Sequence, residues 1–145
     1  MNIKTCFLDT TVFIAAAFPK EKHHKEGREI IISVEKGLLG SPVITDYILD
    51  EVVTFVRKKK GATASIEVLD AILYSPYLRL IKIENRHLEA GLQLFRMYKR
   101  LSLTDAVSIA VMRDLNIEII YSFDSDFDEI PGIIRLTRVK DELKK

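Results

Sequence analysis

Hydrophobic and polar positions follow two different periods along the chain. Short apolar runs rich in β-branched and aromatic residues are typical of buried strands, and they occur at 3–8, 42–45, 78–83, 118–121 and 133–136. Between these runs, apolar residues recur at the three-to-four-residue spacing of one helix face. That spacing predicts helices at 10–18, 21–38, 46–60, 63–74, 84–100 and 103–115, with a turn or short helix at 124–129.

Strands that alternate with helices favour parallel pairing through helical crossovers. The expected fold is therefore an α/β fold, a three-layer α/β/α sandwich with a short, mostly parallel central sheet. The sequence contains no repeat, low-complexity tract or Pro/Ser-rich linker, so residues 1–145 are predicted to form one domain. Its charged tail, 137–145, is expected to fray or dock loosely. In such sheets the ligand crevice lies beyond the carboxyl ends of the strands.

Composition narrows the function only slightly. Lys and Arg (22) nearly balance Asp and Glu (21), so the net charge of +1 gives no global attraction to nucleic acid. The single cysteine, Cys6, cannot form an internal disulfide, which favours a small buried residue in a protein of the reducing cytoplasm. The apolar stretch 10–18 is too short to span a bilayer, and Asp9 interrupts any signal peptide, so no membrane association is expected.

Two aspartates follow predicted strands. Asp9 comes directly after the first strand and Asp124 comes three residues after the fourth, so both are expected at the carboxyl edge of the sheet. Each could instead be a helix N-cap, because Asp is among the residues preferred there, although Thr10 and Thr11 could cap the first helix as well. Neither aspartate decides the function alone.

Glu51 lies at the border between the apolar and polar faces of helix 46–60. A helical wheel places the buried stripe at Ile48, Val52, Phe55 and Val56. Glu51 is expected to lean towards the core, where a carboxylate is costly unless it is paired or binds a metal, whereas Asp50 points to the polar side. The alternative for Glu51 is a buried ion pair or a border residue whose carboxylate reaches solvent.

Asp105 allows two interpretations. Ser102 and Asp105 match a capping box (SLTD), and the same position puts the carboxylate at the mouth of a deeply buried helix that could open onto the crevice. Further along, Asp124, Asp126 and Asp128 fall within five residues. Some of these acids could form turns, and only part of the set can converge on one ion.

Carboxylates that converge would need a cation. Like charges packed together repel and raise one another's pKa until a cation neutralises them. Oxygen ligands without His or Cys suit Mg²⁺ or Mn²⁺ and not Zn²⁺. Such ions activate water and stabilise the attacking and leaving oxygens in phosphodiester hydrolysis. They would also provide the positive field that this chain lacks overall.

Four motifs resemble those of PIN-domain nucleases and occur in the same order. They are 7–14 (FLDTTVFI), 41–45 (SPVIT) with 49–52 (LDEV), 103–110 (LTDAVSIA), and 121–128 (YSFDSDFD) followed by 130–133 (IPGI). The likeness covers 3–136, almost the whole chain. Each motif is weak alone, but four in this order are specific.

This resemblance implies a PIN-like fold and a ribonuclease that depends on Mg²⁺ or Mn²⁺. Most small members resemble toxins of toxin–antitoxin pairs, which commonly form homodimers and are inhibited by a cognate antitoxin protein. By analogy the metal-binding and catalytic acids would be Asp9, Glu51, Asp105 and Asp124, with Asp126 as an alternative or an addition to the fourth. We expect a metal-activated water to attack the RNA phosphate in line, which leaves a 5′-phosphate and a 3′-hydroxyl.

Three hydroxyl residues would support these acids. Thr10 and Thr11 follow Asp9 directly, and Ser122 stands where the family often has a hydroxyl near the site. Thr11 departs from the Asn or Ser that many members carry. This departure leaves the acids untouched and is expected to weaken only the polar support around Asp9.

The one dense basic run is open to two interpretations. It is either a solvated helix end that suits the helix dipole or a patch that meets RNA phosphates, and it comprises Arg57, Lys58, Lys59 and Lys60. His23 and His24 lie on a polar stretch and are predicted to face solvent.

Two other functions compete with the nuclease. An aspartyl-nucleophile phosphatase needs a second Asp two residues after the first, where this chain has Thr11, so we discard it. A catalytically silent PIN-like fold that binds RNA or a protein is the alternative, although clustered negative charge gives a pure RNA binder no advantage. DNA binding contributed by an antitoxin is compatible with the nuclease.

Overall fold

The central sheet decides where the functional residues can meet. The computed structural model describes residues 5–139, so positions 3–4 of the first predicted strand and 140–145 of the tail lie outside the described residues. The strands pair in the order β3-β2-β1-β4-β5, and every pairing is parallel, which confirms the predicted sheet. They are β1 (Cys6–Leu8), β2 (Val43–Thr45), β3 (Arg79–Ile81), β4 (Ile119–Tyr121) and β5 (Ile134–Leu136).

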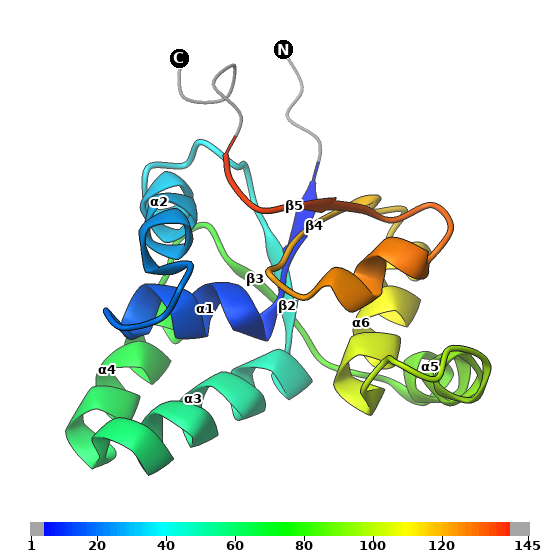
Figure 1. Ribbon diagram of the computed structural model, residues 1–145, viewed down its shortest axis with the longest axis horizontal. Helices are drawn as coiled ribbons and strands as arrows, with labels where there is room; N and C mark the ends of the chain where they lie inside the picture. The colour runs from blue at the N-terminus through cyan, green and yellow to red at the C-terminus, as the bar shows by residue number, and fades with distance from the viewer. Residues whose placement is uncertain (1–4, 140–145) are drawn as a thin grey trace.

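Helices cover both faces of this sheet, as the sandwich prediction requires. Figure 1 shows α1 to α4 on one side of the strands and α5 and α6 on the other. Right-handed crossovers produce this division, because the chain runs from β1 to β3 in one direction and then returns past β1 to β4. The helices are α1 (Thr10–Ala17), α2 (His24–Glu35), α3 (Asp46–Lys60), α4 (Ala62–Leu73), α5 (Asn85–Met97), α6 (Leu103–Asp114) and the 3-10 helix η1 (Ser125–Glu129).

Two glycines let helices of the same layer approach closely. A Cβ on Gly27 of α2 would stand 2.9 Å from the Ala15 Cβ of α1, and a Cβ on Gly91 of α5 would stand 2.7 Å from the Val107 Cγ2 of α6. Such distances are shorter than real carbon contacts, so any larger residue would separate the paired helices. The close approach holds α1, which follows the carboxyl end of β1, firmly against α2, and holds α6 firmly against α5.

Most of the predicted core is confirmed, with one error on α3. Cys6 is buried, and α6 is buried along a continuous run from Ala106 to Met112. Val139 is buried as well, so the predicted tail is docked at that point. Phe55 was assigned to the buried stripe of α3, but 36% of it is exposed. In residues 5–139 no helix is both long enough and apolar enough to cross a bilayer.

The order of the strands creates a switch point beside β1. The chain leaves β1 towards β2, whereas β4 pairs on the opposite side, so the carboxyl ends of β1 and β4 lie next to each other. The backbone N–H of Asp9 donates to the Tyr121 carbonyl at 3.1 Å across this pair. In doubly wound sheets the ligand crevice lies at such a point. The residues that follow β1 and β4 are therefore the ones to examine for chemistry.

Candidate active site at the carboxyl edge of the sheet

Asp9 is buried at the end of β1, with 2% of it exposed. It occupies the N-cap position of α1; its side chain makes no cap hydrogen bond of standard geometry, although the backbone N–H groups of Thr10 and Thr11 lower its pKa. Its Oδ2 instead accepts from the hydroxyls of Ser122 (2.7 Å) and Thr11 (2.8 Å). Burial raises the pKa of Asp9, and these hydrogen bonds offset only part of the rise. Among residues 5–139, no Lys or Arg nitrogen forms an ion pair with this carboxylate at an N···O distance of 4.0 Å or less.

The two hydroxyls connect Asp9 to the turn after β4. Thr11 Oγ1 accepts from the N–H of Phe123 at 3.0 Å, and Ser122 Oγ accepts from the N–H of Asp124 at 3.0 Å. Each hydroxyl therefore accepts from the turn and donates to Asp9, which fixes its rotamer. The Thr11 hydroxyl supports Asp9 directly, and the expectation that Asn or Ser would support it better stays a prediction.

Asp105 is both a helix cap and a member of the site. The capping box is present: Asp105 N donates to Ser102 Oγ at 3.0 Å, and Ser102 N donates to Asp105 Oδ2 at 3.4 Å. Burial, followed by repulsion from Asp9 and Asp124, raises the pKa of Asp105 to about 7. Carboxylates from the end of β1, the first turn of α6 and the turn after β4 thus act on one another at a single edge of the sheet.

The acids after β4 diverge, as the sequence suggested. Asp124 Oδ1 accepts from the N–H of Asp126 at 2.9 Å and so caps η1, while the charge of Asp124 acts on Asp105. Asp126 Oδ1 instead lies 2.8 Å from Arg100 Nη2, in an ion pair. Asp128 turns away to Arg135 at 2.8 Å. Within this set, Asp124 is the acid whose charge acts on Asp105.

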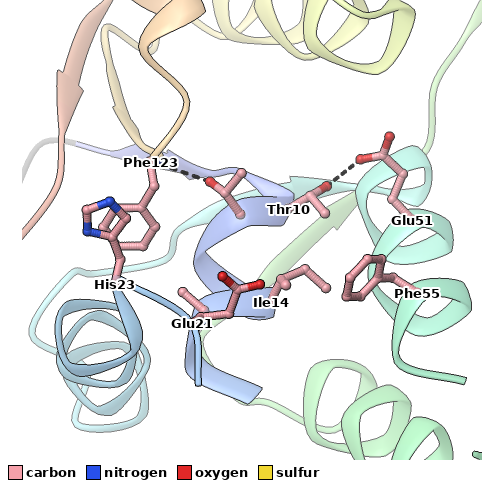
Figure 2. Close-up of a pocket in the computed structure, with 9 residues that line it drawn as sticks. Thr10, Ile14, Glu21, His23, Glu51, Phe55 and Phe123 are labelled. Atoms are coloured by element: carbon pink, nitrogen blue, oxygen red, sulfur yellow. Dashed lines mark hydrogen bonds between the residues drawn. The ribbon is translucent and has the colours of Figure 1, made fainter. Parts of the chain in front are cut away.

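Glu51 differs from its predicted environment. It is exposed on α3 and does not lean towards the core, so the argument that burial obliges it to bind a metal is wrong. Its Oε1 accepts from Thr10 Oγ1 at 2.6 Å (Figure 2). Asp50 is exposed, as predicted, and accepts from Thr54 at 3.2 Å. Glu51 therefore meets the site through Thr10, the residue that follows Asp9.

The donor chemistry of this edge fits a hard divalent cation. The side chains offered are carboxylate and hydroxyl oxygens, which Mg²⁺ and Mn²⁺ prefer. Across residues 5–139, no three Asp, Glu, His or Cys side chains already stand at the mutual spacing of ligands to one ion. The carboxylates are thus gathered closely enough to repel, and side-chain rotation would have to complete a metal site.

A cavity of about 510 Å³ adjoins these acids and is drawn in Figure 2. Thr10, Thr11 and Glu51 line it, so it shares residues with the acid site. The rings of His23 and Phe123, also in its wall, stack with centroids 4.5 Å apart and planes 6° apart. The prediction that the histidines face solvent is confirmed only in part: 40% of the His23 side chain is exposed, whereas His24 is partly buried and its Nδ1 lies 2.8 Å from the Ala15 carbonyl.

The predicted basic run divides into two kinds of residue. Lys60 Nζ donates to the Ala17 carbonyl at 2.6 Å, and Arg57 Nε donates to Ser65 Oγ at 3.1 Å, so these two serve the packing of α3. Lys59 Nζ lies 5.9 Å from the ring centroid of Phe55, which leaves its charge at the surface. Lys58 is exposed as well. All four residues are exposed in the last turn of α3, in agreement with the helix-end interpretation, and the RNA-binding interpretation stays a prediction.

Arg135 is a residue of the site that the sequence did not indicate. Its Nη1 donates to the Ser122 carbonyl at 3.1 Å, while its Nε and Nη2 bind Asp128 in a bidentate pair. It therefore braces the turn that carries Ser122 and Asp124. Arg135 lies in a strand of mixed exposure with no motif around it, so only the pairing of β4 with β5 could reveal this contact.

Comparison with known proteins places the chain in a family. The model of the PIN domain matches residues 6–133. A VapC ribonuclease of Archaeoglobus fulgidus is 30% identical over 131 residues, which cover 88% of this chain and 81% of that protein. The crystal structure of Mycobacterium tuberculosis VapC20, described as a toxin that cleaves the sarcin–ricin loop, matches with a TM-score of 0.77 and 26% identity over 89% of this chain and 96% of that one. VapBC2 of Rickettsia felis, solved bound to promoter DNA, shares the fold at a TM-score of 0.67 and 17% identity, over 91% and 97% of the two chains.

Proposed function

The chain belongs to the PIN domain family, and on this basis we propose that it is a divalent-metal-dependent endoribonuclease and the toxin of a toxin–antitoxin pair. One observation carries the proposal beyond the family likeness. Asp9, Asp105 and Asp124 come from three separate elements, yet Asp9 and Asp124 both act on Asp105, whose pKa is raised to about 7 by burial first and by repulsion from these two acids second. A fold gains no stability from such an arrangement, whereas a cation that bridges phosphate and carboxylates would be attracted by it.

We propose that Mg²⁺ or Mn²⁺ would be bound by four acids, Asp9, Asp105, Asp124 and Glu51. A bound ion of this kind supplies a Lewis acid and lowers the pKa of water, so that hydrolysis proceeds at neutral pH. Asp126 is the weaker candidate for the fourth acid, because Arg100 already pairs with it at 2.8 Å. Oxygen donors of this type are the usual ligands of both ions.

The chain's own residues prepare the site in three ways. The Ser122 and Thr11 hydroxyls hold Asp9 in one rotamer, so little ordering is left to occur on binding. Asp105 stands in the first turn of α6, where the charges of Asp9 and Asp124 act on it, so it would help to attract the cation. Arg135 steadies the turn from the far side by binding the Ser122 carbonyl. Attack on the phosphate in line then leaves a 5′-phosphate and a 3′-hydroxyl.

RNA and an antitoxin protein are the proposed partners. Lys58 and Lys59 are exposed at the end of α3 and supply charge for RNA phosphates. An apolar cleft of about 450 Å³, lined by residues of α1, α2 and α4, supports docking of a protein partner, since exposed apolar patches mark such contacts. We further propose that the chain acts as one domain, as a homodimer and in the cytoplasm.

A ribonuclease assay with Mn²⁺ or Mg²⁺ tests the function. Cleavage is expected to stop with EDTA and with Asp9→Asn, and to fall further with Asp124→Asn than with Asp126→Asn. Asp50→Asn is the matched control, because Asp50 is an exposed acid beside Glu51 that the site does not use. Cleavage that survives both EDTA and Asp9→Asn would overturn the proposal. Failure to bind Mn²⁺ in calorimetric titration would instead favour a catalytically silent fold that binds RNA or protein.

A further inference from the structure

The 510 Å³ cavity beside the acids has aromatic walls on two sides. On one side lie the stacked rings of His23, which precedes α2, and Phe123, which follows β4 (Figure 2). On the other side lies the ring of Phe55 on α3, and Ile14 of α1 stands between the two walls (Figure 2). Flat aromatic surfaces contributed by three elements suit a flat aromatic guest.

The charges of the cavity select against a phosphate group. Of the residues between 5 and 139 that line it, Glu21 and Glu51 are acidic and none is Lys or Arg. Figure 2 shows the Glu21 carboxylate directed into the space beside Ile14. A phosphate would be repelled by these carboxylates, whereas an uncharged ring with N–H donors on its edge would be bound by them.

We propose that this cavity binds one nucleobase of the RNA, beside the phosphate that is cleaved, and that it prefers guanine. The inference rests on the proposed ribonuclease function. Bases of single-stranded RNA stack on Phe and His rings and are read by hydrogen bonds to their edges. Guanine presents two adjacent donors, N1–H and the N2 amino group, which match the two oxygens of the Glu21 carboxylate. Adenine, cytosine and uracil each place an acceptor beside their donor, and a carboxylate repels that acceptor.

Shared residues join the cavity to the acid site. Thr10 and Thr11 line the cavity and also bind Glu51 and Asp9, the first at 2.6 Å and the second at 2.8 Å. Phe123 is the residue before Asp124. A base held in the cavity therefore keeps its own sugar and phosphate close to the acid edge, which would fix the bond presented for cleavage.

Nucleotide binding measured by NMR in EDTA tests the inference without relying on activity. Guanosine 5′-monophosphate is expected to shift the ring signals of His23 and Phe123 and to bind about tenfold more tightly than the adenosine, cytidine and uridine monophosphates. Glu21→Gln should remove that preference, while Glu89→Gln, an exposed acid on α5 behind the sheet, should retain it. His23→Ala should weaken all four nucleotides about tenfold, and His23→Phe should restore them.

Several outcomes would overturn the inference. One is that guanosine monophosphate leaves the ring signals unchanged; another is that Glu21→Gln keeps the full preference, or that His23→Phe binds as weakly as His23→Ala. Tighter, Glu21-dependent binding of acetyl-arginine amide would assign the cavity to a basic segment of a partner protein. The two proposals fail separately, because Asp9→Asn should abolish cleavage and leave nucleotide binding intact. If the wild-type protein binds nucleotides but neither it nor any variant cleaves RNA, the proposed ribonuclease function is overturned and the proposal of a base-binding cavity stands.

Discussion

The two ends of α6 carry aspartates that behave in opposite ways. Asp105, in the first turn, has a pKa raised to about 7 by burial and by repulsion from Asp9 and Asp124. Asp114, the last residue, has its pKa lowered by hydrogen bonds from His87 (2.9 Å) and Arg86 (3.0 Å). The helix dipole would shift both the other way, because it favours negative charge at the amino end. Burial and charged neighbours account for the shift at Asp105, and hydrogen-bond partners account for the shift at Asp114.

The difference separates a structural acid from one held for chemistry. Asp114 has cationic and imidazole partners and joins α5 to α6, as a stabilising contact should. Asp105 faces like charges, and among residues 5–139 its hydrogen-bond partner is the Ser102 cap. Asp105 lowers stability because it lies within a cluster of acids. Such an arrangement is typical of a functional site that binds a cation.

Replacing each of these aspartates by asparagine should give the largest effects. Asp105→Asn and Asp114→Asn should change the Tm in opposite directions. Asp105→Asn should lower kcat/KM for RNA more than about 10²-fold, because a lost ligand exceeds the 10–100-fold effect of a lost ligand partner. It should also raise the Tm of the metal-free protein at pH 8, since a repelled buried charge disappears. Asp114→Asn should lower the Tm and leave kcat/KM of the folded protein unchanged. Equal activity losses in the two variants would contradict the comparison.

The pH dependence of unfolding is the next largest effect. The pKa of Asp105 is raised from 3.8 to about 7, so its protonated form favours the folded state and its ionisation opposes folding. In EDTA, the free energy of unfolding is expected to be larger at pH 5 than at pH 8, and Asp105→Asn should flatten this slope. Mn²⁺ should stabilise more at pH 8 than at pH 5, because it binds the ionised acids. Urea denaturation at both pH values checks this, and a metal effect independent of pH would contradict it.

Ser122→Ala should give the smallest effect. Asp9 would lose its 2.7 Å hydrogen bond and keep the one from Thr11, so affinity for Mn²⁺ should fall about tenfold. Stability should fall by about 2 kcal/mol, because the hydroxyl also accepts from the N–H of Asp124 and each hydrogen bond contributes about 1 kcal/mol. Ser41→Ala removes a comparable hydroxyl bond, to the Tyr77 carbonyl, and serves as the control with unchanged Mn²⁺ affinity. Calorimetric titration measures both, and equal affinities would show that the hydroxyl does not support Asp9.

Sequence periodicity was sufficient for the layers and for part of the site. Strands β1, β2 and β4 are short and largely buried, and the capping box at Ser102 is a local pattern, so both could be predicted. The environment of Glu51 could not be predicted, because a helical wheel does not show which edge of the apolar face of α3 is covered by neighbouring helices. Phe55 and Glu51 are exposed because α3 packs against α1 and α4, which is a tertiary outcome.

Contacts between distant residues were the other limit. The bond from Ser122 to Asp9 spans 113 positions, and the stacking of His23 on Phe123 spans a similar stretch of chain. Neither leaves a periodic trace, because each pair is brought together only when β4 docks against β1. The polar character around His23 suggested solvent for the same reason: its ring partner is absent from its own neighbourhood in the sequence.

Helix α3 is bound to α1 by one side-chain hydrogen bond near each end of α1. Thr10, the first residue of α1, binds Glu51, and the carbonyl of Ala17, the last, accepts from Lys60. Two such contacts restrict rotation of α3 relative to α1, which a single contact would allow. If Glu51 turns from Thr10 towards a cation, the Lys60 anchor still holds the far end of α3. The side chain can then change partners while its helix stays in place.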